Sequence, residues 1–311
     1  MGENIIRTTS NVVLLLPLME TAHMRLYRSL LFSFILVFCS AFAHGQSDLK
    51  SITVTFTTID VPGAGYTIIW GVNTAGDMVG SYGQDTSQDA HGFLYSGGTF
   101  TYFDYPSQSV TVPTGINDSN LIVGYAGKNP VVGFLYDGSS FQTLVDGNNT
   151  ATASLGINNA GDVVGGAGTI YTTKGFELRS GKFKTLNVPG HHTYNYGNGI
   201  NNFGTIVGWT ESDGFICRGN ICKIMDYPGA VQTKALGIND GGVVVGWYTS
   251  TGSTGGFASK NGKYISFGFP GAAFTGAEGI NNSGQIVGAY TFDYNAWHGF
   301  VTNPITAADF Q

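Results

Sequence analysis

From residue 53 to the C-terminus, hydrophobic and polar positions alternate in short runs that turn residues separate. A period of two is typical of a β-strand with one buried face, whereas a helix repeats about every 3.6 residues. Runs such as Phe100-Thr101-Tyr102-Phe103 are followed by Asp, Pro or Gly, which favour turns. The pattern therefore predicts an all-β chain of many short strands.

One ten-residue motif, Gly-[Ile/Val]-Asn-x-x-[Gly/Asn]-x-[Ile/Val/Met]-Val-Gly, recurs six times along the chain. Its copies begin at Gly71, Gly115, Gly156, Gly199, Gly237 and Gly279. A Gly-Phe pair follows each copy, and a further alternating run completes the repeat. Four strands in about 42 residues match one blade of a β-propeller. We therefore predict a six-bladed β-propeller with four-stranded blades; the alternative is an open β-solenoid.

The two ends of the repeat region predict how the ring closes. The last repeat lacks a fourth strand after Thr302, whereas residues 53–60 have the pattern of a fourth strand with no other strand before them. We expect this N-terminal outer strand to pair with the last blade and to close the ring. An unclosed array would leave a bare sheet edge, which promotes aggregation.

Several repeated residues have a predicted structural role. The Asn at the third motif position can form an Asx turn, and the sixth position, Gly or Asn120, suits a left-handed backbone. The alternative for the six Asn residues is a ring that binds a ligand. The aromatics that follow the second strand are expected to pack between blades: Tyr82, Tyr125, Trp209, Trp247 and Tyr290.

Composition agrees with this fold and excludes other classes. The chain has 47 Gly among 311 residues and only 11% charged residues. Disordered chains carry more charge, and helical bundles contain far less Gly. Residues 1–43 hold three of the 14 basic and two of the 20 acidic residues, so the remainder has a net charge of −7. Without a basic stripe, binding to nucleic acid is not expected.

The first 43 residues differ from the rest and contain a single Gly. From Met24 they are typical of a secretory signal: Arg25 and Arg28 precede a short apolar run, and Ala41-Phe42-Ala43 provides small residues before a cleavage site. The segment before Met24 is interpreted as an extended or mis-assigned start. The alternative is an N-terminal anchor helix, although the apolar run is short for a membrane span. We predict domains at 1–43 and 44–311, and no stable membrane span in the mature chain.

The cysteines agree with export to an extracellular or periplasmic location. Cys217 and Cys222 flank Gly219-Asn220, which is typical of a two-residue hairpin turn. They would form a non-hydrogen-bonded pair, close enough for a disulfide in an oxidising compartment. A redox-active pair is the alternative. Two thiols alone do not complete a metal site, and we expect neither metal nor cofactor.

The repeated block resembles the HAF-type extracellular repeat family, named for a His-Ala-Phe block. The block here is Gly-Ile-Asn-Asn-x-Gly-x-Ile-Val-Gly followed by His-Gly-Phe; Ala is replaced by Gly throughout, and His is present only at His91 and His298. The resemblance covers roughly residues 51–304. It implies a secreted, propeller-like repeat protein, and it implies no catalytic residue.

Residues that break the repeat are the candidates for binding, since repeated residues serve the scaffold. Three loops depart from the pattern, and a propeller places them on one face: residues 84–91, 191–196 and 292–298. Their candidate ligand-binding residues are His191, His192, Tyr194, Tyr196, Tyr294, Trp297 and His298. Aromatic rings beside carboxylates and amides suit a carbohydrate.

Two function classes follow from this reading. The first is a monomeric, secreted binding or scaffold module for a glycan or another cell-surface ligand. The second is a carbohydrate-active enzyme, a glycoside hydrolase or lyase, that uses loop carboxylates as acid and base: Asp85, Asp89 and Asp293. No sequence motif decides between them, so enzyme activity is left open.

Overall fold

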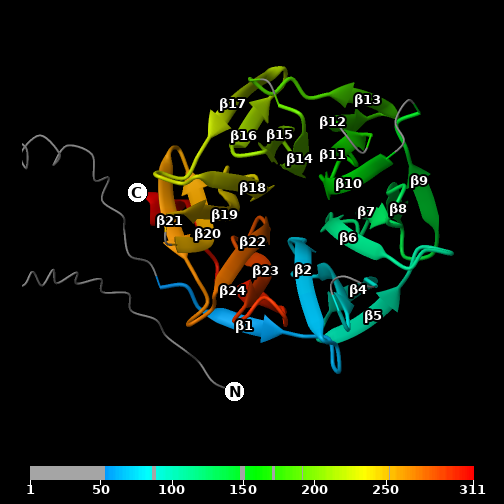
Figure 1. Ribbon diagram of the computed structural model, residues 1–311, viewed down its shortest axis with the longest axis horizontal. Coiled ribbons are helices and arrows are strands. Elements are labelled where there is room, and N and C mark those ends of the chain that lie inside the picture. The colour runs from blue at the N-terminus through cyan, green and yellow to red at the C-terminus, as the bar shows by residue number, and fades with distance from the viewer. Residues whose placement is uncertain (1–52, 86–88, 148–150, 170–171, 191, 252) are drawn as a thin grey trace, which may run out of the picture.

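The computed structural model is a ring of six β-sheets around a central axis (Figure 1). It describes residues 53–85, 89–147, 151–169, 172–190, 192–251 and 253–311, so the predicted signal segment lies outside the described residues. Every sheet has four strands, and neighbouring strands within it are antiparallel. The six-bladed propeller predicted from the repeat is confirmed.

Each blade runs from an innermost strand at the axis to an outermost strand at the rim (Figure 1). The innermost strands are β2 (Tyr66–Val72), β6 (Thr111–Ile116), β10 (Ala151–Ile157), β14 (Asn195–Ile200), β18 (Gln232–Ile238) and β22 (Phe274–Ile280). The second strands are β3 (Met78–Gly83), β7 (Ile122–Ala126), β11 (Val163–Gly168), β15 (Thr205–Thr210), β19 (Val244–Ser250) and β23 (Ile286–Thr291). The third strands are β4 (His91–Ser96), β8 (Val132–Tyr136), β12 (Thr173–Arg179), β16 (Gly214–Arg218), β20 (Ser253–Lys260) and β24 (His298–Thr302). The outermost strands are β5 (Thr99–Phe103), β9 (Phe141–Leu144), β13 (Lys182–Thr185), β17 (Ile221–Met225), β21 (Lys263–Phe267) and β1 (Phe56–Ile59).

Strand β1 closes the ring, as predicted. It pairs antiparallel with β24 and completes the sixth blade. Phe56 packs edge-on against Phe300, with ring centroids 5.2 Å apart, and Val54 is buried in the same core. After β24 the chain forms only a short 3₁₀ helix, η1 (Ala307–Phe310), which confirms that the C-terminus supplies no fourth strand.

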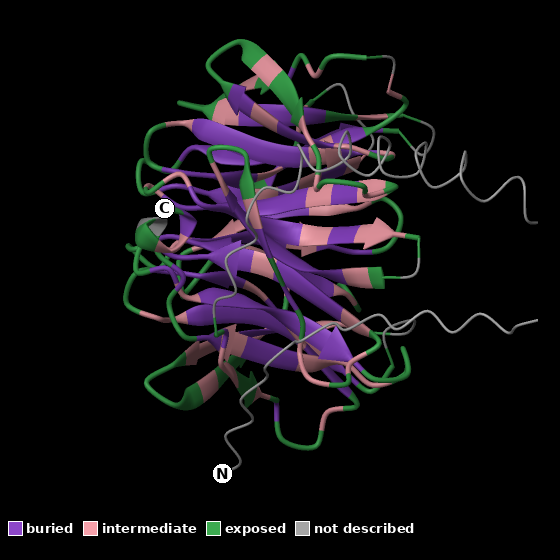
Figure 2. Cartoon of the chain, turned by 90° about the vertical axis from the view of Figure 1, so that its left-hand side faces the viewer, coloured by how far each residue is buried: buried purple, intermediate pink, exposed green. Residues whose placement is uncertain are grey.

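The Gly-Phe pairs fill the interior of the blades. Their phenylalanines are almost completely buried: Phe93, Phe134, Phe176, Phe215, Phe257 and Phe300. Each ring lies opposite the last Gly of the motif on the neighbouring strand; in the first blade, a Cβ added to Gly80 would lie 2.5 Å from the Phe93 ring. This Gly recurs because a side chain there would collide with the core. Figure 2 shows the buried strands between two exposed loop faces.

The motif glycines that begin each copy form the narrowest point on the axis. A Cβ on Gly71 would lie 3.1 Å from the Cα of Gly115, and one on Gly156 would lie 2.4 Å from the carbonyl oxygen of Asn198. The innermost strands therefore approach one another more closely than side chains would permit. We call these six residues the glycine ring: Gly71, Gly115, Gly156, Gly199, Gly237 and Gly279.

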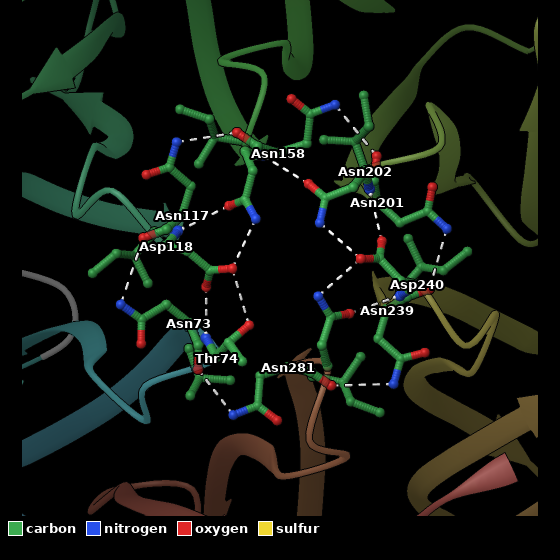
Figure 3. A pocket seen from close by; sticks show the side chains of 18 residues that line it. Asn73, Thr74, Asn117, Asp118, Asn158, Asn201, Asn202, Asn239, Asp240 and Asn281 are labelled. Carbon is green, nitrogen blue, oxygen red and sulfur yellow. Dashed lines mark hydrogen bonds between the residues drawn. The ribbon is translucent and has the colours of Figure 1, made fainter.

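Two residues after each member of the glycine ring comes a motif asparagine, and the six asparagines form a closed belt of hydrogen bonds (Figure 3). The side-chain amide of each donates to the backbone oxygen of the corresponding Asn in the next blade, at 2.9–3.5 Å. The side-chain oxygen accepts from the backbone within its own turn, as at Asn117 and Ser119. The Asx turn is confirmed, and the sixth position has a positive φ in all six copies. Because the side-chain amides bind neighbouring blades around a well of about 70 Å³, the belt joins the six blades at the axis.

Removing the closing strand should destabilise the whole molecule. A chain that begins at Val61 loses the β1–β24 pairing and the burial of Val54 and Phe56. We expect its free energy of unfolding to fall by about 3 kcal/mol or more, the scale for removing one large core side chain. Thermal and urea unfolding, compared with a chain that begins at Thr53, measure the change. Identical melting of the two chains would refute closure by β1.

Candidate functional site

A cavity of about 590 Å³ opens around the axis. It lies on the loop face that carries the connections into the innermost strands and those between second and third strands, and the glycine ring closes its inner end. All four tryptophans of the chain line it: Trp70, Trp209, Trp247 and Trp297. Tryptophan is the scarcest aromatic residue here, so its collection in one cavity distinguishes this place from the rest of the surface.

The repeat determines which positions face the cavity. Along each innermost strand, alternate residues point to the axis, so the positions one and three residues before the glycine ring line the cavity. The deeper layer is Trp70, Thr114, Leu155, Asn198, Leu236 and Glu278. The upper layer includes Ile68, Val112, Ala153, Tyr196 and Lys234. These positions differ from blade to blade, whereas the adjacent glycine is the same in all six copies.

Three aromatics of the second strands also line the cavity. Tyr125, Trp209 and Trp247 lie beside Val112, Tyr196 and Lys234 in the strand register. The prediction that they pack between blades is wrong for these three, because their strands turn this position toward the axis. For Tyr82 and Tyr290 the packing prediction holds, since both contact the hydrophobic interior.

A continuous arc of aromatic rings runs along the wall from the fourth blade to the sixth. Tyr196 stacks on Trp209 with centroids 4.5 Å apart, and Lys234 lies between Trp209 and Trp247. Phe274 contacts both Trp247 and Trp297, at 5.6 Å in each case. Two exposed tyrosines extend the arc at its ends: Tyr194 contacts Tyr196 and Trp209, and Tyr294 contacts Trp297.

Lys234 and Glu278 are the only charged side chains among the residues described as lining the cavity. The Lys234 ammonium lies 3.7 Å from the centroid of the Trp209 ring and 4.9 Å from that of Trp247, within range of cation–π attraction. Burial lowers the pKa of Lys234, and the negative charge of Glu278 opposes that shift. The ammonium is therefore positioned by aromatic faces and not by a close ion pair.

Glu278 lies in the deeper layer of the cavity wall. Burial raises its pKa to about 7, against the opposing effect of Lys234. Among the described residues, no hydrogen-bond donor reaches its carboxyl group, and no cation lies within 4.0 Å. A partly buried carboxyl without a partner is costly for the fold, which favours a role in binding or chemistry.

Two indole groups are fixed by hydrogen bonds within the scaffold. The Trp70 Nε1–H donates to Ser81 Oγ at 2.9 Å, and the Trp209 Nε1–H donates to Asn198 Oδ1 at 3.2 Å. The protein satisfies the polar edges of both indoles, and Trp209 is also covered by Tyr196 and by the Lys234 ammonium. The wall is thus pre-formed for stacking.

Of the loop residues predicted to bind a ligand, Tyr196 and Trp297 line the cavity, and Tyr194 and Tyr294 flank it. Trp297 is held in place by its backbone, which bonds to Thr67 at 2.9 Å. These four aromatics come from two distant loops, and the structure brings them to one arc. The structure thus brings these predicted residues together on one face, at the mouth of a cavity that the sequence did not predict.

The histidines have other surroundings. The Nδ1 atom of His298 lies 2.8 Å from a carboxylate oxygen of Asp60, and that of His192 lies 3.1 Å from Glu211. Neither histidine lines the cavity. His191 lies outside the described residues. Both described histidines thus join neighbouring segments of the scaffold at the rim.

The predicted catalytic carboxylates lie on exposed loops. Asp293 accepts hydrogen bonds from the backbone N–H groups of Asn295 and Ala296, and these lower its pKa. A general acid needs the opposite shift. Asp85 and Asp89 are exposed, and none of the three lines the cavity, where Glu278 is the sole carboxyl group among the described residues.

Cys217 and Cys222 form a disulfide across the β16–β17 hairpin, with Cα atoms 4.0 Å apart. The predicted pairing, next to the Arg218–Ile221 pair, is confirmed. Within the described ranges, no cluster of three or more His, Cys, Asp or Glu side chains has the arrangement of a metal site. No helix in the same ranges is long and apolar enough to span a membrane.

Comparison with known proteins supports the fold and goes no further. No protein-family model matches the chain, and no curated protein matches its sequence. Among solved structures, a gluconolactonase from Xanthomonas campestris is similar with a TM-score of 0.51 and 11% identity, over 81% of this chain and 90% of that one. A second protein assigned as a gluconolactonase has a TM-score of 0.51 and 12% identity, over 82% and 94% of the two chains. The SapL1 lectin, solved with alpha-methyl fucoside, has a TM-score of 0.47 and 11% identity, over 73% and 88%.

The raised pKa of Glu278 predicts how stability depends on pH. The pKa of the Glu278 carboxyl group is about 7 in the folded chain and 4.5 in the unfolded chain. Between these pH values the unfolded chain releases this proton more readily, so the free energy of unfolding falls as the pH rises. Glu278→Gln removes this effect. The difference in Tm, variant minus wild type, should therefore rise from pH 4.5 to 7 and then stay constant.

Asp293→Asn provides a control of opposite sign. Because the pKa of Asp293 is lowered in the fold, its ionised form stabilises the native state above the ordinary pKa, and the variant should lose that contribution at neutral pH. Calorimetry of both variants from pH 4 to 8 measures the two profiles. Parallel curves for wild type and Glu278→Gln would contradict the assigned environment of Glu278.

Proposed function

We propose that this chain is a secreted β-propeller that binds a saccharide in its central cavity and catalyses no reaction. The observation that carries the proposal is the collection of all four tryptophans in one cavity, beside the single lysine and single carboxyl group among its described lining residues. Within the same proposal, the chain belongs to the HAF-type repeat family that its six motifs resemble. The disulfide between Cys217 and Cys222 supports an oxidising compartment.

Sugar chemistry matches the two kinds of surface in the cavity. A pyranose ring has an apolar face of C–H groups, which stacks on indole rings, and a rim of hydroxyl groups that need hydrogen-bond partners. In the arc, Trp247 and Trp297 contact Phe274 edge-on and offer ring faces, whereas Tyr196 and Trp209 stack on each other. Glu278 can accept from a hydroxyl group, and Lys234 can donate to one.

Pre-formed aromatic walls favour binding because little side-chain freedom is lost when the ligand enters. The indoles of Trp70 and Trp209 are already fixed by hydrogen bonds to the scaffold, and Trp247 is held between Lys234 and Phe274. A rigid site avoids the cost of ordering each aromatic side chain on binding.

Truncating one wall residue should weaken binding without affecting the fold. A glycan array with the mature chain identifies a saccharide, and calorimetric titration then measures its Kd. For Trp247→Ala we expect about a tenfold weaker Kd, or about 1.4 kcal/mol, because the ligand loses a stacking face. Tyr102→Ala on the outer strand β5 is the control, since Tyr102 is half-exposed and far from the axis. Equal affinity of wild type and Trp247→Ala would place the saccharide elsewhere.

A carbohydrate-active enzyme is the second candidate, and the pKa of Glu278 near 7 favours it. A carboxyl group that is half-protonated at neutral pH can donate and recover a proton. Release of reducing ends or of unsaturated products from the array-positive saccharide tests this. Turnover that Glu278→Gln abolishes while its Kd stays within about threefold would establish catalysis; the absence of turnover in wild type would leave the binding module.

A further inference from the structure

A second hollow, of about 460 Å³, lies on the face opposite the central cavity, between the fourth and fifth blades. It is formed by the turns that follow β14 and β18 and by the hairpins that follow β16 and β20. Phe203, Arg218 and Lys260 line it. The glycine ring and the asparagine belt separate it from the cavity on the other face, so a ligand there is independent of the central site.

Phe203 breaks the repeat at a position where the other blades have small side chains. The corresponding residues are Ala75, Ser119, Ala160, Gly241 and Ser283. The Phe203 side chain is 77% exposed, so it adds almost nothing to the core. In the fifth blade the equivalent residue is Gly241, the smallest of the series, which leaves space beside the Phe203 side chain. An exposed aromatic face next to an open hollow is a surface on which a ring-shaped ligand can stack.

Arg218 and Lys260 occupy equivalent positions at the ends of β16 and β20. In the third blade the equivalent residue, Arg179, donates to Asp162 and Glu177, both at 2.9 Å. In the fourth and fifth blades those two carboxylates are replaced by Thr205 and Ile216, and by Val243 and Ala258. Within the described ranges, no carboxylate lies within 4.0 Å of Arg218 or Lys260. Arg218 and Lys260 therefore lack the two carboxylates that neutralise Arg179 in the third blade.

The single carboxylate of the hollow, Asp240, is already engaged by the scaffold. It accepts from the backbone and side-chain N–H groups of Asn202 and from the side chain of Asn282, at 2.8–2.9 Å. Three hydrogen bonds hold its charge in the ring. The remaining polar groups at the lining, including those of Thr205 and Asn261, suit a ligand that carries hydroxyl groups.

The disulfide fixes one side of this hollow. Cys217 precedes Arg218 directly, and its bond to Cys222 closes the hairpin that presents the guanidinium. A guanidinium on a restrained hairpin loses less freedom when it binds an anion, and its planar donors match a carboxylate or a sulfate group.

We propose that this hollow is a second binding site, for a sugar ring that carries a carboxylate or sulfate group. The ring stacks on Phe203, Arg218 and Lys260 bind the anionic group from two adjacent blades, and the polar lining contacts hydroxyl groups. The site takes an acidic saccharide whether or not the central cavity takes a neutral one.

The test titrates the purified mature chain with three oligosaccharides of equal length: a galacturonate oligomer, a sulfated oligomer and a neutral oligomer. We expect binding of one or both acidic probes and weaker binding at higher salt. Any binding of the neutral probe should take place in the central cavity and should not change when Arg218 and Lys260 are replaced. The double variant Arg218→Ala/Lys260→Ala should lose at least tenfold in affinity for the acidic probe, and Phe203→Ser should lose severalfold. Which acidic probe binds identifies carboxylate or sulfate as the anion.

Two controls separate this site from its alternatives. Lys174→Ala/Lys223→Ala removes two cations that do not line the hollow and that pair with neither Arg218 nor Lys260 in the strand register, and it should leave the acidic probe bound as in wild type. Trp247→Ala alters the central cavity but should leave the affinity of the hollow for the acidic probe unchanged. A negative result for the central cavity would therefore not count against the second site. An equal loss of affinity for the neutral and the acidic probe in the Arg218→Ala/Lys260→Ala variant, or wild-type affinity for the acidic probe in that variant with an unchanged Tm, would overturn the proposal.

Discussion

Close approach of six strands at one axis is the constraint on which this molecule depends. The innermost strands meet at the glycine ring, where an added Cβ would lie 2.4–3.3 Å from the neighbouring blade. Real Cβ atoms rarely come so close, so a side chain there would force the backbone of the neighbouring blade to shift. The asparagine belt then joins each blade to the next, and its last bond, from Asn281 to the backbone of Asn73, connects the sixth blade to the first. Closure is thus made twice, once at the axis and once by β1 at the rim.

Because the glycine ring fixes the scaffold, the residues that precede it along each innermost strand can differ from blade to blade. The two layers that precede the ring hold Trp70, Lys234 and Glu278 in three blades, Tyr196 and Asn198 in the fourth blade, and small or aliphatic residues elsewhere. A change at these positions alters the cavity and leaves the blade cores, built on the Gly-Phe pairs, intact. The same separation holds on the opposite face, where Phe203 alters a turn whose neighbouring Gly204 still has the required positive φ. Repeat architecture thus allows function to vary at low cost to stability.

The fold was predictable from the sequence because every blade repeats the same local chemistry. Blade number, the left-handed turn position, the closing strand and the disulfide all followed from spacing and residue type, as at Asn120 and Cys217–Cys222. The cavity was not predicted, because a strand residue that faces the axis has the same alternating pattern as one that faces a neighbouring blade. Lys234 and Glu278 were the missed signal, since both are charged residues in strands that are otherwise largely apolar or small. The roles of His192 and His298 depend on Glu211 and Asp60, whose proximity arises only from the folded ring.

The glycine ring has one more consequence, for how a molecule can enter and leave. The axial channel narrows at the ring, from the cavity of about 590 Å³ to spaces of about 70 Å³. A long polymer cannot thread through the molecule, and anything that enters must retreat through the same mouth. A polysaccharide would be recognised by a chain terminus or a short branch, and its interior units would be left outside. The number of free ends in a sample, and not its total mass, would then set how many copies of this protein it can hold.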